Sequence, residues 1–138
     1  AEETVIAEGI TLCHLHTAPT DTAGLTVEED GIRKPDDFRH EQYLMIHEHG
    51  KKILISGCSH KGIVQIANWF RPDVLVGGFH LKAVSPEEPF LLEVAQGLMG
   101  LPTAYYTGHC TGQAQFDKMK TVMGERLFAI STGTVLEL

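Results

Sequence analysis

The sequence predicts a single α/β domain in which a β-hairpin is followed by βαβ units. Its 138 residues suit one ordinary domain with a sizeable core. From residue 52 onward, short apolar runs typical of buried strands alternate with longer runs of helical periodicity. That alternation is typical of a layered α/β fold with a parallel sheet. No internal duplication or low-complexity tract divides the chain, so residues 1–138 form one predicted domain.

The first 51 residues predict strands and a long loop. TVIA and ITLCHLH each suit a strand, with Gly9 as the break between them. TAPTDTAGLTVEEDGIRKPDD collects Thr, Asp, Gly and Pro, and we expect a loop there. EQYLMIHEHGKKILISG then predicts two strands joined as a hairpin at His49-Gly50.

The remaining residues predict three helices between strands. KKILIS, DVLVGG, TAYYTG and RLFAIST are the expected strands, and TVLEL is a candidate partner for the last one. KGIVQIANWF predicts a helix whose apolar positions fall at i, i+3, i+4 and i+7: Ile63, Ile66, Ala67 and Phe70. QAQFDKMKTVMG predicts another, with one apolar face made by Phe116, Met119 and Met123.

The second of these helices carries the clearest end signals. In SPEEPFLLEVAQGLMG, Ser85 is the expected N-cap, Pro86 the first helical residue and Glu88 the partner that completes a capping box. Gly100 is the expected end of the helix.

Composition excludes several classes of protein. The net charge of −7 comes without a cluster of Lys and Arg, so we expect no nucleic-acid partner. No apolar run approaches the ~20 residues of a membrane helix, so we expect no membrane partner. Three widely spaced cysteines suit reduced thiols and a cytoplasmic location better than a disulfide framework. AEETVIAEG is not a signal peptide, and a start at Ala1 fits a processed or partial product.

A histidine follows three of the predicted strands, and glycine precedes each of them. His60 ends SGCSH, His80 ends VGGFH, and His109 follows the glycine of TGHC. Successive strands of βαβ units run parallel, so their carboxyl ends lie on one edge, where open α/β sheets bind ligands. The pattern therefore predicts a site at this edge that contains all three histidines.

Other interpretations of these residues stay open. A single histidine after a strand is commonly a capping or hydrogen-bonding group. Cys58 with His60, and His109 with Cys110, also allow a structural zinc site, although neither spacing resembles a zinc finger. A nucleophilic Cys58 or Cys110 beside a histidine is a further, minor alternative.

Three other clusters carry weaker predictions. His14 and His16 alternate along a strand and share a face, where we expect half-buried side chains. Histidines on or near the hairpin are expected to be solvated: His40, His47 and His49. PDDFRHEQ predicts a charged loop in which one acidic residue supports the SGCSH strand end from behind, the candidates being Asp36, Asp37 and Glu41.

Residues 36–138 resemble the second half of a metallo-β-lactamase superfamily hydrolase. The motifs GCSH-x-G-I, GGFHL and HCTG occur in the expected order and are followed by STGTVLEL. More narrowly, they are similar to the dihydropterin-ribofuranosylaminobenzene-phosphate synthase-like subgroup. The resemblance implies half of an αββα sandwich with a metal site at one edge of its sheets.

The same resemblance assigns roles to the three histidines. His60 and His109 resemble metal ligands of the family, whereas His80 has no counterpart in the broad superfamily and is expected to contact the substrate or its leaving group. The family's His-x-His-x-Asp-His motif is absent: CHLHTAPTD is the nearest string and departs from it at Thr17. Its usual Gly-Asp-Thr turn appears as Gly57-Cys58-Ser59, which removes the bridging aspartate.

Two functions follow as expectations. In one, the chain is the C-terminal part of a divalent-metal hydrolase, with zinc the first expectation and iron, manganese, nickel or copper as alternatives. It would act on a phosphorylated or pterin-like small molecule, and its N-terminal half would complete the site. In the other, it is a non-catalytic binding or regulatory module. A half sandwich leaves an apolar face uncovered, so we expect self-association or association with the missing half.

Overall fold

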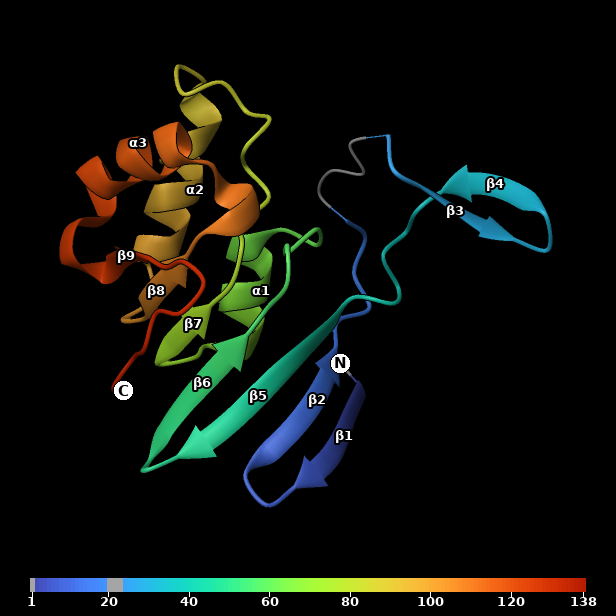
Figure 1. The fold of residues 1–138 in the computed structure, drawn as a ribbon, viewed down its shortest axis with the longest axis horizontal. Coiled ribbons are helices and arrows are strands. Elements are labelled where there is room, and N and C mark those ends of the chain that lie inside the picture. The colour runs from blue at the N-terminus through green and yellow to red at the C-terminus, as the bar shows by residue number, and fades with distance from the viewer. Residues whose placement is uncertain (1, 20–23) are drawn as a thin grey trace.

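The computed structural model describes residues 2–19 and 24–138, and its centre is one mixed sheet (Figure 1). Seven strands lie in the order β1-β2-β5-β6-β7-β8-β9, and a separate two-stranded sheet pairs β3 with β4. The strands are β1 (Glu2–Ala7), β2 (Ile10–His14), β3 (Thr26–Glu29), β4 (Ile32–Pro35), β5 (Gln42–Glu48), β6 (Lys51–Ile55), β7 (Val74–Val76), β8 (Ala104–Thr107) and β9 (Leu127–Ala129). The helices are α1 (Ile63–Phe70), α2 (Pro89–Met99) and α3 (Gln113–Met123), with 3₁₀ turns at His109–Thr111 and Gly124–Arg126.

The sheet changes from antiparallel to parallel at β6. Strands β1, β2, β5 and β6 form an antiparallel meander, and β6, β7, β8 and β9 run parallel. The turn between β5 and β6 has positive φ at both His49 (48°) and Gly50 (76°), the conformation that a two-residue hairpin needs. The predicted hairpin and the predicted parallel βαβ arrangement are both confirmed.

All three helices pack on the same face of the sheet. One row of paired residues points toward them, and four of its members are fully buried: Leu54, Leu75, Tyr105 and Leu127. The apolar face predicted for the first helix is buried against this row, as are Met119 and Met123 of α3. The hydrophobic core therefore lies between the sheet and a single layer of helices.

The opposite face of the sheet is also apolar, and no helix of residues 2–19 and 24–138 covers it. Neighbouring residues of a strand point to opposite faces. The residue that follows each core-row residue in its strand therefore points to the opposite face, and these residues form a second row. That row crosses six strands as Leu12, Leu44, Ile55, Val76, Tyr106 and Phe128. Ile55 is 40% exposed, and the rings of Tyr106 and Phe128 stack with centroids 4.7 Å apart. A sheet with two apolar faces needs a layer on each, so this row supports the expected half sandwich.

The loop expected over residues 17–37 is wrong in part. Within it, β3 and β4 form a hairpin that projects from the body (Figure 1). Its turn at Asp30 (φ 51°) and Gly31 (φ 76°) is a left-handed pair, for which Asp-Gly is a favoured sequence. The two strands are short and charged, so their sequences show only a weak alternation of apolar and polar residues. Without that alternation, the Asp30-Gly31 turn predicts a loop and not a hairpin. Residues 20–23 of the expected loop lie outside the described part of the chain.

Two element boundaries also differ from the prediction. Helix α2 begins at Pro89, not at Pro86, and its N-cap is Glu88 with φ −66° and ψ 128°. Residues before proline avoid the helical region, so Pro89 fixes the start and the Ser85 capping box does not form. The predicted stop at Gly100 is confirmed. Residues 131–138 form a turn and an extended tail, so TVLEL does not pair with β9.

None of the helices in the described residues is both long enough and apolar enough to cross a lipid bilayer.

Candidate functional site

The loops that follow the four parallel strands meet at one edge of the sheet and are tied together by backbone hydrogen bonds. Gly78 N–H donates to the carbonyl oxygen of Gly57 at 2.8 Å, which joins the loops after β7 and β6. Lys82 N–H donates to the carbonyl oxygen of Cys110 at 2.9 Å, which joins the loops after β7 and β8. The predicted edge therefore exists as a connected structure.

Glycines at this edge allow the loops to approach closely. A Cβ atom on Gly77 would lie 2.6 Å from the carbonyl oxygen of Ser56, and one on Gly108 would lie 2.5 Å from that of Ile130. Real Cβ atoms do not come this near to backbone oxygens, so no other residue fits at either position without a shift of the loops. The glycines that precede His80 and His109 thus have a packing reason, whereas a Cβ on Gly57, before His60, would meet no atom within 4 Å.

His60 and His80 lie against each other. Their ring centroids are 4.1 Å apart with the rings tilted by 54°, and His60 also stacks on Phe38 at 4.0 Å with 12° between the planes. Both histidines line a cavity of about 520 Å³ between α1, α2 and the loop after β7. Most of its remaining wall is apolar, including Phe79 and Phe90. We call this space the helix-side cavity.

His109 lies at the same edge but lines other spaces. It is exposed, and it borders a cavity of about 710 Å³ with Cys58, Gly78 and residues 130–132. We call this space the sheet-side trough, since Ile55 and Val76 of the open sheet face also line it. The helix-side cavity and the trough share no lining residue. The structure therefore brings His60 to His80, and it places His109 beside Cys58 in a separate space.

The backbone at the edge is held in an uncommon conformation. Ser59 (φ 62°), His80 (φ 52°) and His109 (φ 52°) are all left-handed, one in each strand-end loop that carries a histidine. Each such residue costs roughly 1–3 kcal/mol relative to a relaxed backbone. Strain of this kind concentrates where a fold must aim side chains at a ligand.

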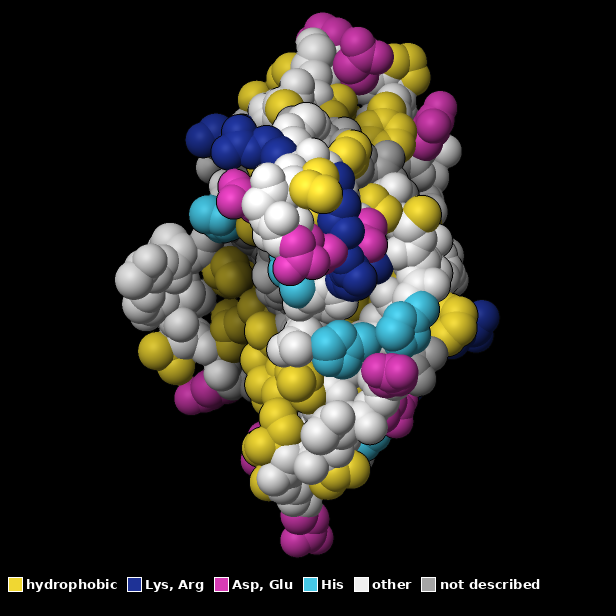
Figure 2. Space-filling view, turned by 90° about the vertical axis from the view of Figure 1, so that its right-hand side faces the viewer, with side chains coloured by type: hydrophobic (Ala, Val, Ile, Leu, Met, Phe, Trp, Pro, Cys, Tyr) yellow, Lys and Arg dark blue, Asp and Glu magenta, His cyan; other side chains and the backbone are white. Residues whose placement is uncertain are grey.

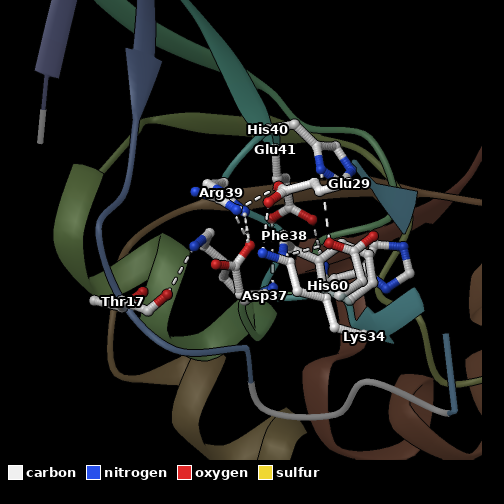
Figure 3. A network of polar contacts seen from close by, with 11 residues as sticks. Thr17, Glu29, Lys34, Asp37, Phe38, Arg39, His40, Glu41 and His60 are labelled. Carbon is white, nitrogen blue, oxygen red and sulfur yellow. Dashed lines mark hydrogen bonds and ion pairs between the residues drawn. The ribbon is translucent and has the colours of Figure 1, made fainter. Parts of the chain in front are cut away.

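A buried carboxylate and a buried ring support His60 from behind. Glu41 is 9% exposed and accepts hydrogen bonds from His60 N–H (2.7 Å) and from the Tyr43 hydroxyl, so Glu41 is the acidic residue behind the SGCSH strand end. Phe38, also left-handed (φ 51°), is held by its N–H donating to Asp36 Oδ1 at 2.8 Å. Figure 3 shows Phe38 lying against His60, with Glu41 close by. Phe38 could not be predicted as part of the site, because its contact with His60 spans 22 positions of the chain.

The charged loop around this support is connected to the projecting hairpin. Arg39 forms ion pairs with Glu29 of β3 and with Asp37 (3.5 Å), and His40 lies 3.7 Å from Asp36. The ammonium group of Lys61, whose residue is 2% exposed, donates to the carbonyl oxygen of Thr17 at 2.7 Å (Figure 3). Asp36 and Asp37 thus organise the loop, and Glu41 accepts a hydrogen bond from the backbone of His60.

The remaining histidines take no part in the edge. His40, His47 and His49 are exposed, as predicted. His14 is half-buried and near the Gln42 amide (3.3 Å), whereas His16 is exposed and 3.7 Å from Glu2, so only His14 matches the expected half-buried state. Figure 2 shows histidines gathered with acidic and basic side chains in the middle of one face of the molecule.

Burial changes the acidity of two groups at the edge. Burial, together with the neighbouring His80, lowers the pKa of His60 below its ordinary value of 6.5, which favours a neutral imidazole at pH 7. Burial raises the pKa of the Cys110 thiol to about 11. Cys110 is therefore protonated at neutral pH, and this state disfavours the nucleophilic-cysteine alternative for that residue.

The donors present do not form a complete metal site. Within residues 2–19 and 24–138, no group of three or more His, Cys, Asp or Glu side chains is placed to hold a metal ion. Catalytic zinc sites use three protein ligands plus an open position. The imidazoles at the edge have the right chemistry for a transition metal, but any further ligands would have to come from outside the described residues.

The architecture defines a mixed α/β domain whose candidate site lies at the carboxyl ends of its parallel strands, where such sheets bind ligands. Comparison with known proteins narrows this class. No protein-family model matches the chain. It is 30% identical over 95 residues to the uncharacterized protein MJ0448 of Methanocaldococcus jannaschii, a match that takes in 66% of this chain and 35% of that protein.

A solved structure gives the more informative likeness. The chain is similar to the crystal structure of Tm1679, a metal-dependent hydrolase of the β-lactamase superfamily, with a TM-score of 0.77 and 28% identity. The match covers 99% of this chain and 56% of that one, so the chain spans little more than half the length of Tm1679. The predicted α/β fold class is thereby confirmed, and the likeness supports the β-lactamase superfamily. It does not distinguish the subgroup within it.

Proposed function

We propose that this chain is the C-terminal portion of a metal-dependent hydrolase of the β-lactamase superfamily, similar to the dihydropterin-ribofuranosylaminobenzene-phosphate synthase-like subgroup. The observation that carries the proposal is the strand-end edge, where three strained loops present His60, His80 and His109. The likeness to Tm1679 supports the reaction class, since that protein is a metal-dependent hydrolase.

The metal proposed for the complete protein is a divalent transition metal, with zinc first and iron or manganese as alternatives. When bound, such a metal supplies Lewis acidity and lowers the pKa of its water toward ~7. His109 and His60 are the proposed ligands from this chain. These two histidines line separate spaces. His109 is the stronger candidate for a metal ligand, because the trough that it lines also contains Ile55 and Val76 of the open sheet face, where a second layer would lie. Because the set is incomplete, we derive no chemical step through the metal.

His80 is proposed to contact the substrate or its leaving group, because its imidazole lines the helix-side cavity. The helix-side cavity beside it is of a size for a small molecule. Its apolar wall suits the flat part of a pterin-like substrate, and the two imidazoles at its rim suit a phosphate. A phosphorylated or pterin-like small molecule is therefore the proposed substrate class.

The proposed partner is the other half of the sandwich, or a second copy of the chain. The open row from Leu12 to Phe128 gives an apolar surface on which a second sheet would pack. A cytoplasmic location is proposed from three free thiols, two of them partly exposed, which suit a reducing compartment.

A non-catalytic binding or regulatory module is the alternative. The observation that favours it is the absence of a three-ligand metal cluster within the described residues. Such a module would keep the helix-side cavity and bind its ligand without turnover.

The test uses a longer protein in which this chain is preceded by a half that carries His-x-His-x-Asp-His. We expect bound metal and hydrolysis of bis(4-nitrophenyl) phosphate. His109→Ala should remove both. His80→Ala should keep the metal and lower turnover about 100-fold, the scale of general acid–base assistance. A longer protein that binds the probe but never hydrolyses it, with or without added metal, would favour the binding module.

A further inference from the structure

Two thiols meet at the strand-end edge although 52 positions separate them in the sequence. Cys58 follows β6 and Cys110 lies in the 3₁₀ turn after β8, with β7 between these strands. The Cys110 thiol lies against the backbone of Cys58, with its sulfur 3.8 Å from the Cys58 carbonyl oxygen. Both are free and partly exposed, whereas the third cysteine, Cys13, is 2% exposed.

Gly78 makes this meeting possible. A Cβ atom there would lie 2.5 Å from the Cys110 sulfur, so any other residue would fill the space through which Cys110 reaches across β7. The loops on both sides are fixed by backbone hydrogen bonds, from Gly78 N–H to Gly57 and from Lys82 N–H to Cys110. The packing of three loops thus holds the Cys110 sulfur beside the Cys58 backbone.

We propose that Cys58 and Cys110 form a reversible intramolecular disulfide at this edge, made by exchange with a low-molecular-weight disulfide. The Cys58 sulfur attacks one sulfur of the oxidant, and a mixed disulfide forms as the first small thiol leaves. The Cys110 thiol then gives up its proton, so that its sulfur attacks the Cys58 sulfur, and the second small thiol leaves. Because the pKa of Cys110 is raised to about 11, this second step should be slow at neutral pH and faster as the pH rises. The two cysteine protons depart with the two thiols, and two electrons pass from the cysteine pair to the oxidant.

The bond would act on the groups around it. The Cys110 sulfur accepts the backbone N–H of His80 at 3.3 Å, and Cys58 lines the sheet-side trough with His109. Drawing Cys110 toward Cys58 would therefore disturb the left-handed backbone of His80 and narrow the trough. Oxidation and ligand binding at the edge would oppose each other.

The experiment treats the folded 138-residue chain with oxidised glutathione, blocks the remaining thiols with N-ethylmaleimide in denaturant at mildly acidic pH, and measures the intact mass and the peptide map. We expect a monomer that has lost two hydrogens, with the peptides of Cys58 and Cys110 joined and only Cys13 blocked. Cys13→Ser should still form the bond. Cys58→Ser and Cys110→Ser should each stop at a mixed disulfide with glutathione.

Three results within a single chain would overturn the proposal. They are stable glutathione adducts on the wild-type chain in place of the internal bond, a bond that involves Cys13, and a chain whose Cys58 and Cys110 both remain reduced at glutathione concentrations that oxidise a control dithiol. A disulfide that joins two copies of the chain would count equally against it.

Discussion

At the scale of single residues, the strand-end edge depends on two kinds of position. At some there is no room for a side chain, and at others the backbone of a non-glycine residue is held in a strained conformation. Gly78 is the clearest case of exclusion, because Cys110 occupies the place of its missing side chain. Ser59, His80 and His109 are the cases of strain. These features lie in the loops, whereas the strands below them are regular.

Gly78→Ala should lower the free energy of unfolding by about 1–3 kcal/mol, the usual effect of inserting a methyl group into filled space. Gly57→Ala is the matched control. It lies at the same edge, but a Cβ there meets no atom within 4 Å, so its effect should stay within about 0.5 kcal/mol. Urea denaturation measures both, and equal effects of the two changes would show that the contact with Cys110 is not tight.

Stability should fall as the pH drops through about 6.5 because of His60. The lowered pKa of His60 means that the unfolded chain takes up a proton first, so the contribution of His60 is complete above 6.5 and is lost below it. Free energies of unfolding between about pH 7.5 and pH 5.5 measure the slope, in a range where most carboxylates stay ionised. His60→Gln should flatten the slope, and an unchanged slope in that variant would assign the effect to other groups.

The three site histidines could be predicted from the sequence because strand, glycine and histidine are local signals, and parallel topology brings them to one edge. Their division between two cavities could not be predicted. It depends on which way each loop turns after its glycine, and on Phe38 and Glu41, whose contacts with His60 form only in the fold. Periodicity within a segment carries no information on such distant contacts.

At the scale of elements, long apolar patterns were informative and short charged ones were not. The strands and helices from residue 52 onward follow their apolar periodicity. The β3–β4 hairpin could not be predicted, because its strands are short, charged and mostly exposed. Only the Asp30-Gly31 turn distinguishes its sequence from that of a loop. At α2, two prolines three residues apart compete as the first helical residue, and the helix begins at Pro89 and not at Pro86 because Glu88, as a residue before proline, avoids the helical conformation.

Helices α1 and α2 pack closely at Gly97, and this contact can be tested by a double-mutant cycle. A Cβ on Gly97 would lie 2.9 Å from the Val64 Cγ1 atom. Gly97→Ala gains helix propensity of about 1 kcal/mol but meets this branched, stiff side chain. In a Val64→Ala background the same change should be more favourable by about 1 kcal/mol. Equal effects in both backgrounds would mean that the two helices adjust freely.

At the scale of the whole molecule, the sheet has helices on one face and an apolar row on the other. Helices on one side alone leave side chains such as Ile55 in contact with water. The chain also spans 56% of the length of Tm1679. Both observations agree with a fold of which this chain supplies about half the layers.

The uncovered face should make the isolated chain self-associate, and Ile55→Lys should reduce that association by placing a charge in the middle of the row. Ile32→Lys is the matched control: Ile32 is 68% exposed but lies on the projecting hairpin. Sedimentation velocity over a range of concentrations measures the effect. A wild-type chain that is monomeric at every concentration would contradict the prediction. Loss of self-association in Ile32→Lys but not in Ile55→Lys would show that the copies contact each other through the hairpin.

The central claim is that this chain holds only part of a metal site. Elemental analysis after dialysis against a chelator and then against zinc tests it most directly, with the isolated chain and the longer protein treated side by side. We expect the longer protein to retain zinc in stoichiometric amount and the isolated chain to retain little, because metal affinity falls steeply when ligands are missing. Tight, stoichiometric zinc in the isolated 138-residue chain, abolished by His109→Ala, would contradict the claim and show that the edge is a complete site.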